Sequence, residues 1–358
     1  MRSFAVWYDT EDHIDHDVKA KIHINFWNSV EYLQKEKDCF FDFGFLINDI
    51  SGISTINLYC PFYVKKEGSC GYNIYDLGAK ISNIELIDAI FNENYSAVSG
   101  APKRYLVNTK PYEVRSSSES ESSDFEKFVI YSLDENSEID IQYCKKQPYQ
   151  VDNANKNNKC NDGTIITLKI KDIEKYSSEI LEDTKAYYFR IRIRVQENAL
   201  STITQNVNYK FFLKANLYST VVMDFRLNDI RSFNQEIKNK YTHGRKFKII
   251  SVNYLIMKNI TDEVEALGTN MTCRLLESDL WNQYIDGLQN NMMAYHIKKK
   301  MIHDKPIQDF CAIVKVKYEK VTWKLLVGYL FGAVAIGAGG NLFYEGVCLL
   351  CKLATNGN

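Results

Sequence analysis

The stretch AYYFRIRIRV, from Ala186 to Val195, alternates apolar and charged residues. In an extended chain successive side chains point to opposite faces of the sheet. One face then carries Phe189, Ile191, Ile193 and Val195, and the other carries Arg190, Arg192 and Arg194. This period of two predicts a β-strand with its apolar face in the core and its arginine face in solvent.

Six more stretches rich in aromatic and β-branched residues predict further strands. They are CFFDFGFLI (39–47), STINLYCPFYV (54–64), GTIITLKI (163–170), YKFFLKANLYSTVVMDFRL (209–227), FKIISVNYLIM (247–257) and DFCAIVKVKYEKV (309–321). Apolar spacings of three and four predict helices over 24–36, 83–93 and 275–300. We therefore expect a β-rich α+β fold, with sandwich or barrel-like sheets and flanking helices.

Two polar stretches, RSSSESESSDFE (115–126) and QVDNANKNNKCNDG (150–163), offer little apolar surface to bury. They suggest a first β-rich unit with an N-terminal helix over 1–114, and a loop-rich connection over 115–163. A second β-rich unit with helices would follow over 164–320. The last predicted segment, 321–351, crosses or inserts into a membrane.

Composition argues against a nucleic-acid binder, because 44 basic residues face 45 acidic ones and leave no basic excess. The N-terminal sequence MRSFAVWYDTEDHIDH lacks the apolar core of a secretory signal. The nine cysteines of the chain are scattered and form no dense framework, which is typical of reduced, buried thiols. We expect the main domain in the cytoplasm.

The C-terminal stretch LLVGYLFGAVAIGAGGNLFYEGVCLL (325–350) is uncharged from Leu325 to Tyr344. About twenty helical residues rise about 30 Å, the thickness of the bilayer hydrocarbon. Lysines cluster before the stretch, at 298–300, 305, 315, 317, 320 and 324, whereas only Lys352 follows it. By the positive-inside rule this predicts a single-pass tail anchor with the main domain on the cytoplasmic side.

The same stretch has other possible structures. IGAGGNL resembles the start of a dinucleotide-binding glycine loop, but Leu342 stands at the third glycine position, and too little chain follows for the rest of that motif. A core helix or a re-entrant hairpin that turns at Gly337–Asn341 stays open.

Small residues recur at spacings of four, three and four within the stretch. They are Gly328, Gly332, Ala335 and Gly339. On a continuous helix they would form one stripe that lets a second helix approach closely, which predicts self-association. Glycine and alanine are also simply frequent in membrane helices.

The predicted arginine row suggests a ligand site. Guanidinium groups at Arg190, Arg192 and Arg194 could bind a small anionic ligand or lipid headgroups, with Tyr188 beside them for stacking. The competing interpretation is a solvated sheet face with acidic partners on neighbouring strands.

His13, His16 and Asp17 are spaced to reach one transition metal from a helix or turn. The alternative is a polar first turn that caps a helix. No nucleophile elbow or Walker loop occurs, and we expect no cofactor.

This organisation predicts a membrane-tethered cytosolic sensor, effector or partner-binding protein. Its C-terminal helices would anchor it and could assemble to perturb the membrane, as in cell-suicide or phage-defence effectors. That comparison is an analogy of architecture. The alternative is a membrane-anchored enzyme, metal-dependent through the N-terminal histidines.

Overall fold

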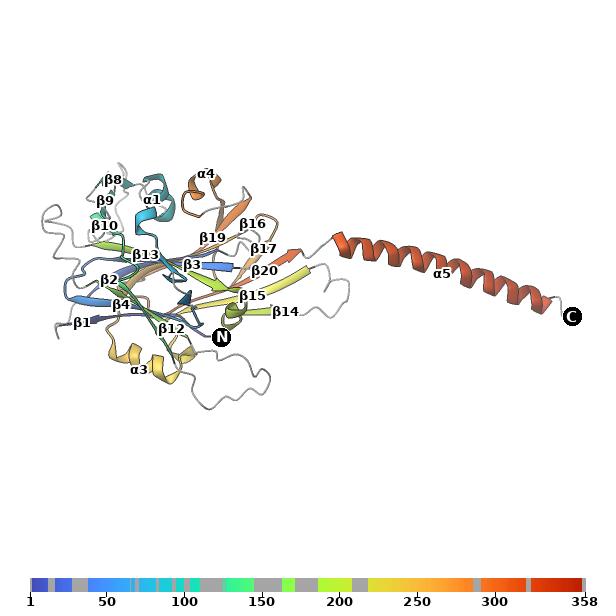
Figure 1. Ribbon diagram of the computed structural model, residues 1–358, viewed down its shortest axis with the longest axis horizontal. Coiled ribbons are helices and arrows are strands. Elements are labelled where there is room, and N and C mark those ends of the chain that lie inside the picture. Colours follow the sequence, from blue (N-terminus) through green and yellow to red (C-terminus); the bar gives the residue numbers. More distant parts are fainter. Residues whose placement is uncertain are drawn as a thin grey trace. The chain divides into compact units, whose positions relative to one another are not determined.

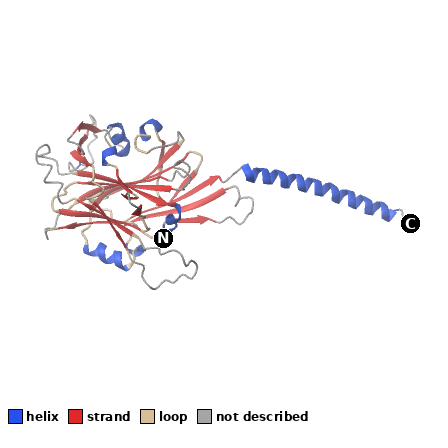
Figure 2. Ribbon diagram, viewed as in Figure 1, coloured by secondary structure: helices blue, strands red, loops and turns tan. Residues whose placement is uncertain are grey.

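The structure is a computed structural model. It describes residues 2–11, 17–27, 38–64, 66–67, 71–81, 84–91, 95–99, 104–109, 125, 127–144, 163–170, 186–207, 218–285, 291–319 and 323–355. The chain divides into two compact units. One comprises 1–205 with 222–316, and the other comprises 206–221 with 317–358. The fold is β-rich, with several sheets and a long C-terminal helix, as the sequence predicts (Figures 1 and 2).

The largest sheet has ten strands. Its order is β18 (Thr272–Leu275), β19 (Met292–Lys300), β16 (Lys248–Asn259), β2 (Lys19–Trp27), β3 (Asp38–Ile47), β13 (Tyr187–Gln196), β10 (Lys127–Tyr131), β9 (Arg104–Thr109) and β8 (Tyr95–Ser99), with β7 (Ile74–Asp76) also paired to β13. The pairs β16–β2 and β10–β13 are parallel, and the other neighbours on this path are antiparallel.

Smaller sheets complete the β-structure. One has the order β1 (Ala5–Thr10), β4 (Ile53–Cys60), β12 (Thr164–Lys169) and β11 (Ile139–Tyr143). Another has the order β14 (Thr204–Val207), β15 (Tyr218–Leu227), β20 (Phe310–Glu319) and β17 (Glu263–Leu267), and β5 (Lys66–Glu67) pairs with β6 (Gly71–Tyr72). Short 3-10 helices occupy Gly78–Lys80, Glu197–Thr202 and Ile230–Ser232.

One face of the ten-stranded sheet packs on aromatic side chains from the other strands. Phe4, just before β1, lies with its ring centroid 5.4 Å from Phe41, 5.6 Å from Phe62 and 5.0 Å from Phe225. All four side chains are buried. Such tilted and stacked contacts add to the burial of apolar area, so this aromatic layer forms the centre of the core.

The opposite face of this sheet is covered by α1 (Ile84–Phe91) and α4 (Ser278–Trp281), as Figure 1 shows. Its buried cluster joins Trp27 and Leu46 from the sheet to Ile87 from α1 and Trp281 from α4. A third helix, α3 (Gln235–His243), packs through Ile237 and Tyr241 on the sheet that contains β1.

The prediction that the arginine face of β13 lies in solvent is wrong. Arg190 is 0% exposed and Arg192 is 6% exposed, while Ile191 and Ile193 on the opposite face are also fully buried. β13 is a central strand between β3 and β10, and both of its faces are covered. Alternation therefore located the strand, but it could not tell a wet polar face from a buried ionic one.

The helix predicted over 83–93 is confirmed as α1, but the helix over 275–300 is wrong. Among the described residues of this span only Ser278–Trp281 is helical, and Met292–Lys300 forms β19, which pairs antiparallel with β16 over nine residues. Of the helix predicted over 24–36, residues 24–27 belong to β2, and the rest lies outside the described residues. Pairing with neighbouring strands overrides a helical spacing in such short apolar runs.

The two β-rich units expected over 1–114 and 164–320 share their sheets. Strands from 1–114 alternate with strands from 164–320 in the same sheets, as in the neighbours β2–β16, β3–β13 and β4–β12. The strands of the two ranges therefore do not form separate sheets.

The helix α5 (Trp323–Thr355) runs without interruption through Gly337–Asn341, so the expected alternative of a hairpin turn there is wrong. Residues Val327–Cys351 are long and apolar enough to cross a membrane. Large apolar side chains along this helix are exposed, including Phe331 (71%), Ile336 (78%) and Phe343 (76%).

Candidate functional site

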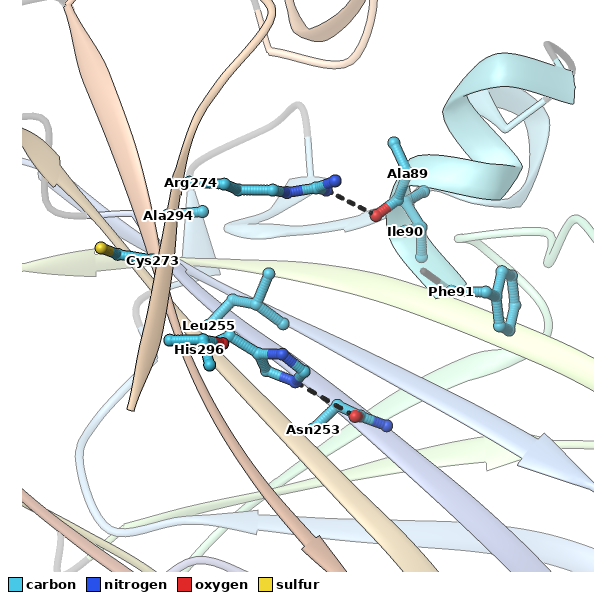
Figure 3. Close-up of a pocket in the computed structure, with 10 residues that line it drawn as sticks. Ala89, Ile90, Phe91, Asn253, Leu255, Cys273, Arg274, Ala294 and His296 are labelled. Atoms are coloured by element: carbon cyan, nitrogen blue, oxygen red, sulfur yellow. Dashed lines mark hydrogen bonds between the residues drawn. The ribbon is translucent and has the colours of Figure 1, made fainter. Parts of the chain in front are cut away.

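A pocket of about 100 Å³ lies where the last turn of α1 meets β16, β18 and β19 (Figure 3). Its apolar lining includes Phe91 from α1, Leu255 from β16 and Ala294 from β19. Its polar lining is Asn253, Thr272, Cys273, Arg274 and His296. None of the ten lining residues is an Asp or a Glu, and the charged side chain among them is the cationic Arg274.

Two hydrogen bonds fix the polar wall (Figure 3). Arg274 donates from Nη2 to the backbone oxygen of Ala89 over 2.9 Å, which ties β18 to the end of α1. His296 Nε2 lies 3.2 Å from Oδ1 of Asn253 on the neighbouring strand. Burial, and then the charges of Lys298 and Arg274, lower the pKa of His296 to about 4. The imidazole is therefore neutral at pH 7 and presents a polar, uncharged surface.

His23 lies behind this pocket, beside Asn253 across the β2–β16 pair. Its ring contacts Phe91 at 4.9 Å and Tyr188 at 5.8 Å between ring centroids. Nδ1 of His23 is buried and has no hydrogen-bond partner among the described residues. Burial, followed by the charge of Arg190, lowers the pKa of His23 well below its usual value, so this histidine is also neutral.

On the same face of the ten-stranded sheet as His23, Asp42 of β3 accepts hydrogen bonds from three side chains. Arg192 donates to both carboxylate oxygens, over 2.7 and 3.0 Å. Trp27 Nε1 donates over 2.7 Å and the hydroxyl of Tyr284 donates over 2.8 Å, both to Oδ2. Burial alone would raise the pKa of Asp42, but the two neighbouring arginines outweigh it and the pKa is lowered.

Arg190 completes this buried ionic network. It donates to the hydroxyls of Tyr284 (2.5 Å) and Tyr188 (2.6 Å), and its Nη2 lies 3.9 Å from Oδ2 of Asp42. With the amide of Asn25 oriented to satisfy both of its groups, Oδ1 of Asn25 accepts from Arg190 over 2.6 Å. Two guanidinium groups thus share one carboxylate, and the neutral oxygens of Tyr188, Tyr284 and Asn25 accept further hydrogen bonds from Arg190.

Gly44 makes room for this arrangement. It lies directly across from Arg190 and His23 on the two neighbouring strands. A Cβ built on Gly44 would fall 2.1 Å from the hydroxyl oxygen of Tyr188. The Tyr188 ring is fully buried and bonded to Arg190, so it has no space to move away.

The structure therefore brings Arg190, Arg192 and Tyr188 together, but within the core and with protein partners. Arg194, farther along the same face of β13, is half-buried. The network contains no activated nucleophile or water-exposed base, and its evident role is structural. Asp42 and Tyr284 were not predicted as part of this site from the sequence. A charged residue inside the apolar run CFFDFGFLI was the one signal for a buried partner.

The predicted metal cluster is only partly described. His13 and His16 lie outside the described residues, while Asp17 is exposed and pairs with Nζ of Lys248. In the described part of the chain, no three His, Cys, Asp or Glu side chains are grouped to hold a metal ion.

The small residues of α5 lie on one continuous helix, as the stripe requires. A Cβ added at Gly328, Gly332 or Gly339 would meet no other atom within 4 Å. Ala335 lies in the same stretch with an exposed side chain. Whether these residues contact another helix stays a prediction.

Comparison with known proteins adds little. No protein family and no curated protein matches the chain. One solved structure that aligns with it is the Mu homology domain of Fcho1 from Danio rerio with a bound Eps15 peptide. That alignment covers 85% of this chain and 80% of the other at 10% identity, with a TM-score of 0.14. A likeness at this level carries no argument about fold or function.

Proposed function

We propose that this protein is a membrane-tethered sensor or effector, in which α5 anchors a β-rich, ligand- or partner-binding body. The observation that carries the proposal is the exposed apolar surface of α5 over Val327–Cys351. Exposed apolar patches of this extent are unfavourable in water and are typical of membrane or partner contacts. The length matches one crossing of the bilayer hydrocarbon.

The lysine-rich sequence before α5 favours a cytoplasmic position for the β-rich body. The small-residue stripe favours association of several α5 helices within the membrane. An effector that assembles in response to a signal, and then perturbs the membrane as cell-suicide or phage-defence proteins do, would use both features.

A fractionation experiment on the full chain tests the anchor. The double substitution Ile336→Lys with Ala338→Lys should move the protein from the membrane pellet to the soluble fraction, because each central charge costs about 3 kcal/mol on insertion. Leucines at the same two positions alter the side chains without adding charge, and this control should stay in the pellet. A wild-type chain that is already soluble, or a lysine variant that stays membrane-bound, contradicts the proposal.

A further inference from the structure

The pocket between α1 and β18 lies within the larger unit, so what it binds does not depend on whether α5 enters a membrane. Arg274 and His296 line it, and the charge of Lys298 acts on His296 from two residues along β19. With no carboxylate in the lining, this arrangement attracts negative charge.

Arg274 contributes most of the positive charge at the pocket. Its side chain is half-buried, and the described residues give its guanidinium one hydrogen bond, to the oxygen of Ala89. No described carboxylate pairs with it. A guanidinium group has five N–H donors in a planar fork that matches a carboxylate, so Arg274 retains donor capacity for an anion that enters the pocket.

The other half of the pocket is apolar, with Ile90 and Phe91 on one side and Leu255 and Ala294 on the other. Its volume of about 100 Å³ is smaller than the roughly 150 Å³ of a cavity that binds benzene. A fitting ligand is therefore a small molecule with one anionic end and a short apolar stem.

We propose that this pocket binds a free short-chain carboxylate such as propionate. The carboxylate lies against Arg274, with His296 and Asn253 beside it. The alkyl stem lies against Phe91 and Leu255. Binding is weak, in the millimolar range, because so few ligand atoms contact the protein.

Calorimetric titration of the full chain in detergent tests the ligand class, with three probes at constant ionic strength. Propionate should bind at one saturable site. Propionamide has nearly the same shape without the charge, and phosphate has charge without an apolar stem, so both should bind at least about tenfold more weakly. Equal binding of propionamide, or tighter binding of phosphate, overturns the assignment.

Two variants locate the site. Arg274→Gln should weaken propionate binding about tenfold or more, since it removes the charge-assisted hydrogen bonds. Lys305→Gln removes one positive charge from an exposed turn outside the pocket and should leave binding unchanged. Equal affinities of wild type and Arg274→Gln would place the ligand elsewhere.

A readout in the wild-type chain covers the case in which Arg274→Gln does not fold. An anion beside His296 favours the imidazolium, so saturating propionate should raise the pKa of His296 measured by NMR, and propionamide should not. An unchanged pKa of His296 at saturation overturns the proposal.

Discussion

Asp42 lies between two buried arginines, and among the described residues it is the one carboxylate that pairs with them. It is 0% exposed. Its charge offsets the cost of burying Arg190 and Arg192, and removing it would leave both guanidinium groups without a counter-ion. Breaking a buried ion pair by removing one partner is costly, even where the intact pair adds little net stability. Loss of Asp42 should therefore destabilise the fold mainly because two buried arginine charges would lack a counter-ion.

We predict that Asp42→Asn lowers the free energy of unfolding by about 3–5 kcal/mol, because Asn keeps the shape and loses the charge. Chemical denaturation of the full chain measures this. Glu265→Gln breaks the exposed pair with Lys315 and should cost no more than about 1 kcal/mol. Similar losses in the two variants would show that the buried network has no special role.

His296 gives a second prediction, in the pH dependence of stability. Its pKa in the folded chain is about 4, below the usual value near 6.5, so the unfolded chain binds more protons between these values. The free energy of unfolding should then be highest above pH 6.5 and fall as the pH drops toward 4. His296→Asn should show a shallower fall than wild type over this window in denaturation curves. Parallel curves would contradict the assignment.

At the scale of elements, the sequence predicted strands where apolar and β-branched residues are dense, and the structure confirms β3, β4, β12, β13, β16 and β20. It failed at β19, whose residues Met292–Lys300 share a helical spacing with the preceding segment. What decides β19 is its nine-residue pairing with β16, and no local pattern encodes that partner. The pocket arises from that pairing and from β18, so it could not be predicted either.

Asn228 connects β15 to β1. At this position the cost of the backbone conformation can be measured separately from the contribution of the side-chain hydrogen bond. Its φ is 59°, its Oδ1 accepts from the backbone N–H of Val6, and its own N–H donates to the oxygen of Phe4. The residue thus ties the beginning of β1 to the end of β15. Asparagine is among the few residues other than glycine that adopt this left-handed backbone readily.

We predict that Asn228→Gly costs about 1 kcal/mol of stability, because it loses the side-chain bond but tolerates the backbone. Asn228→Ala should cost roughly 1–2 kcal/mol more, because it also pays for the left-handed conformation. Thermal or chemical denaturation of both variants gives the order. If Ala is tolerated as well as Gly, the backbone at this position is free to relax.

At the scale of the whole molecule, the sequence predicted a β-rich fold and an apolar C-terminal helix. Stretches rich in aromatic and β-branched residues indicate the strands, and the long uncharged stretch indicates the helix. It could not predict that Arg190 and Arg192 face inward, since the cover over them comes from Tyr284 and Trp27, which lie far away in the chain. Polar residues on an alternating strand are solvated or buried according to the layers that pack on the sheet, and that is a property of the complete fold.

The association of α5 helices is the remaining whole-molecule expectation, and it can be separated from anchoring. Gly332→Leu places bulk in the centre of the small-residue stripe, so it should reduce cross-linked oligomers in membranes while the protein stays in the membrane fraction. Ala333→Leu adds bulk about 100° around the same helix, off the stripe, and should reduce cross-linking less. Both substitutions keep the segment apolar, so insertion is matched. Equal oligomer yields from wild type and both variants would mean that α5 anchors single chains, and any assembly would then depend on the β-rich body.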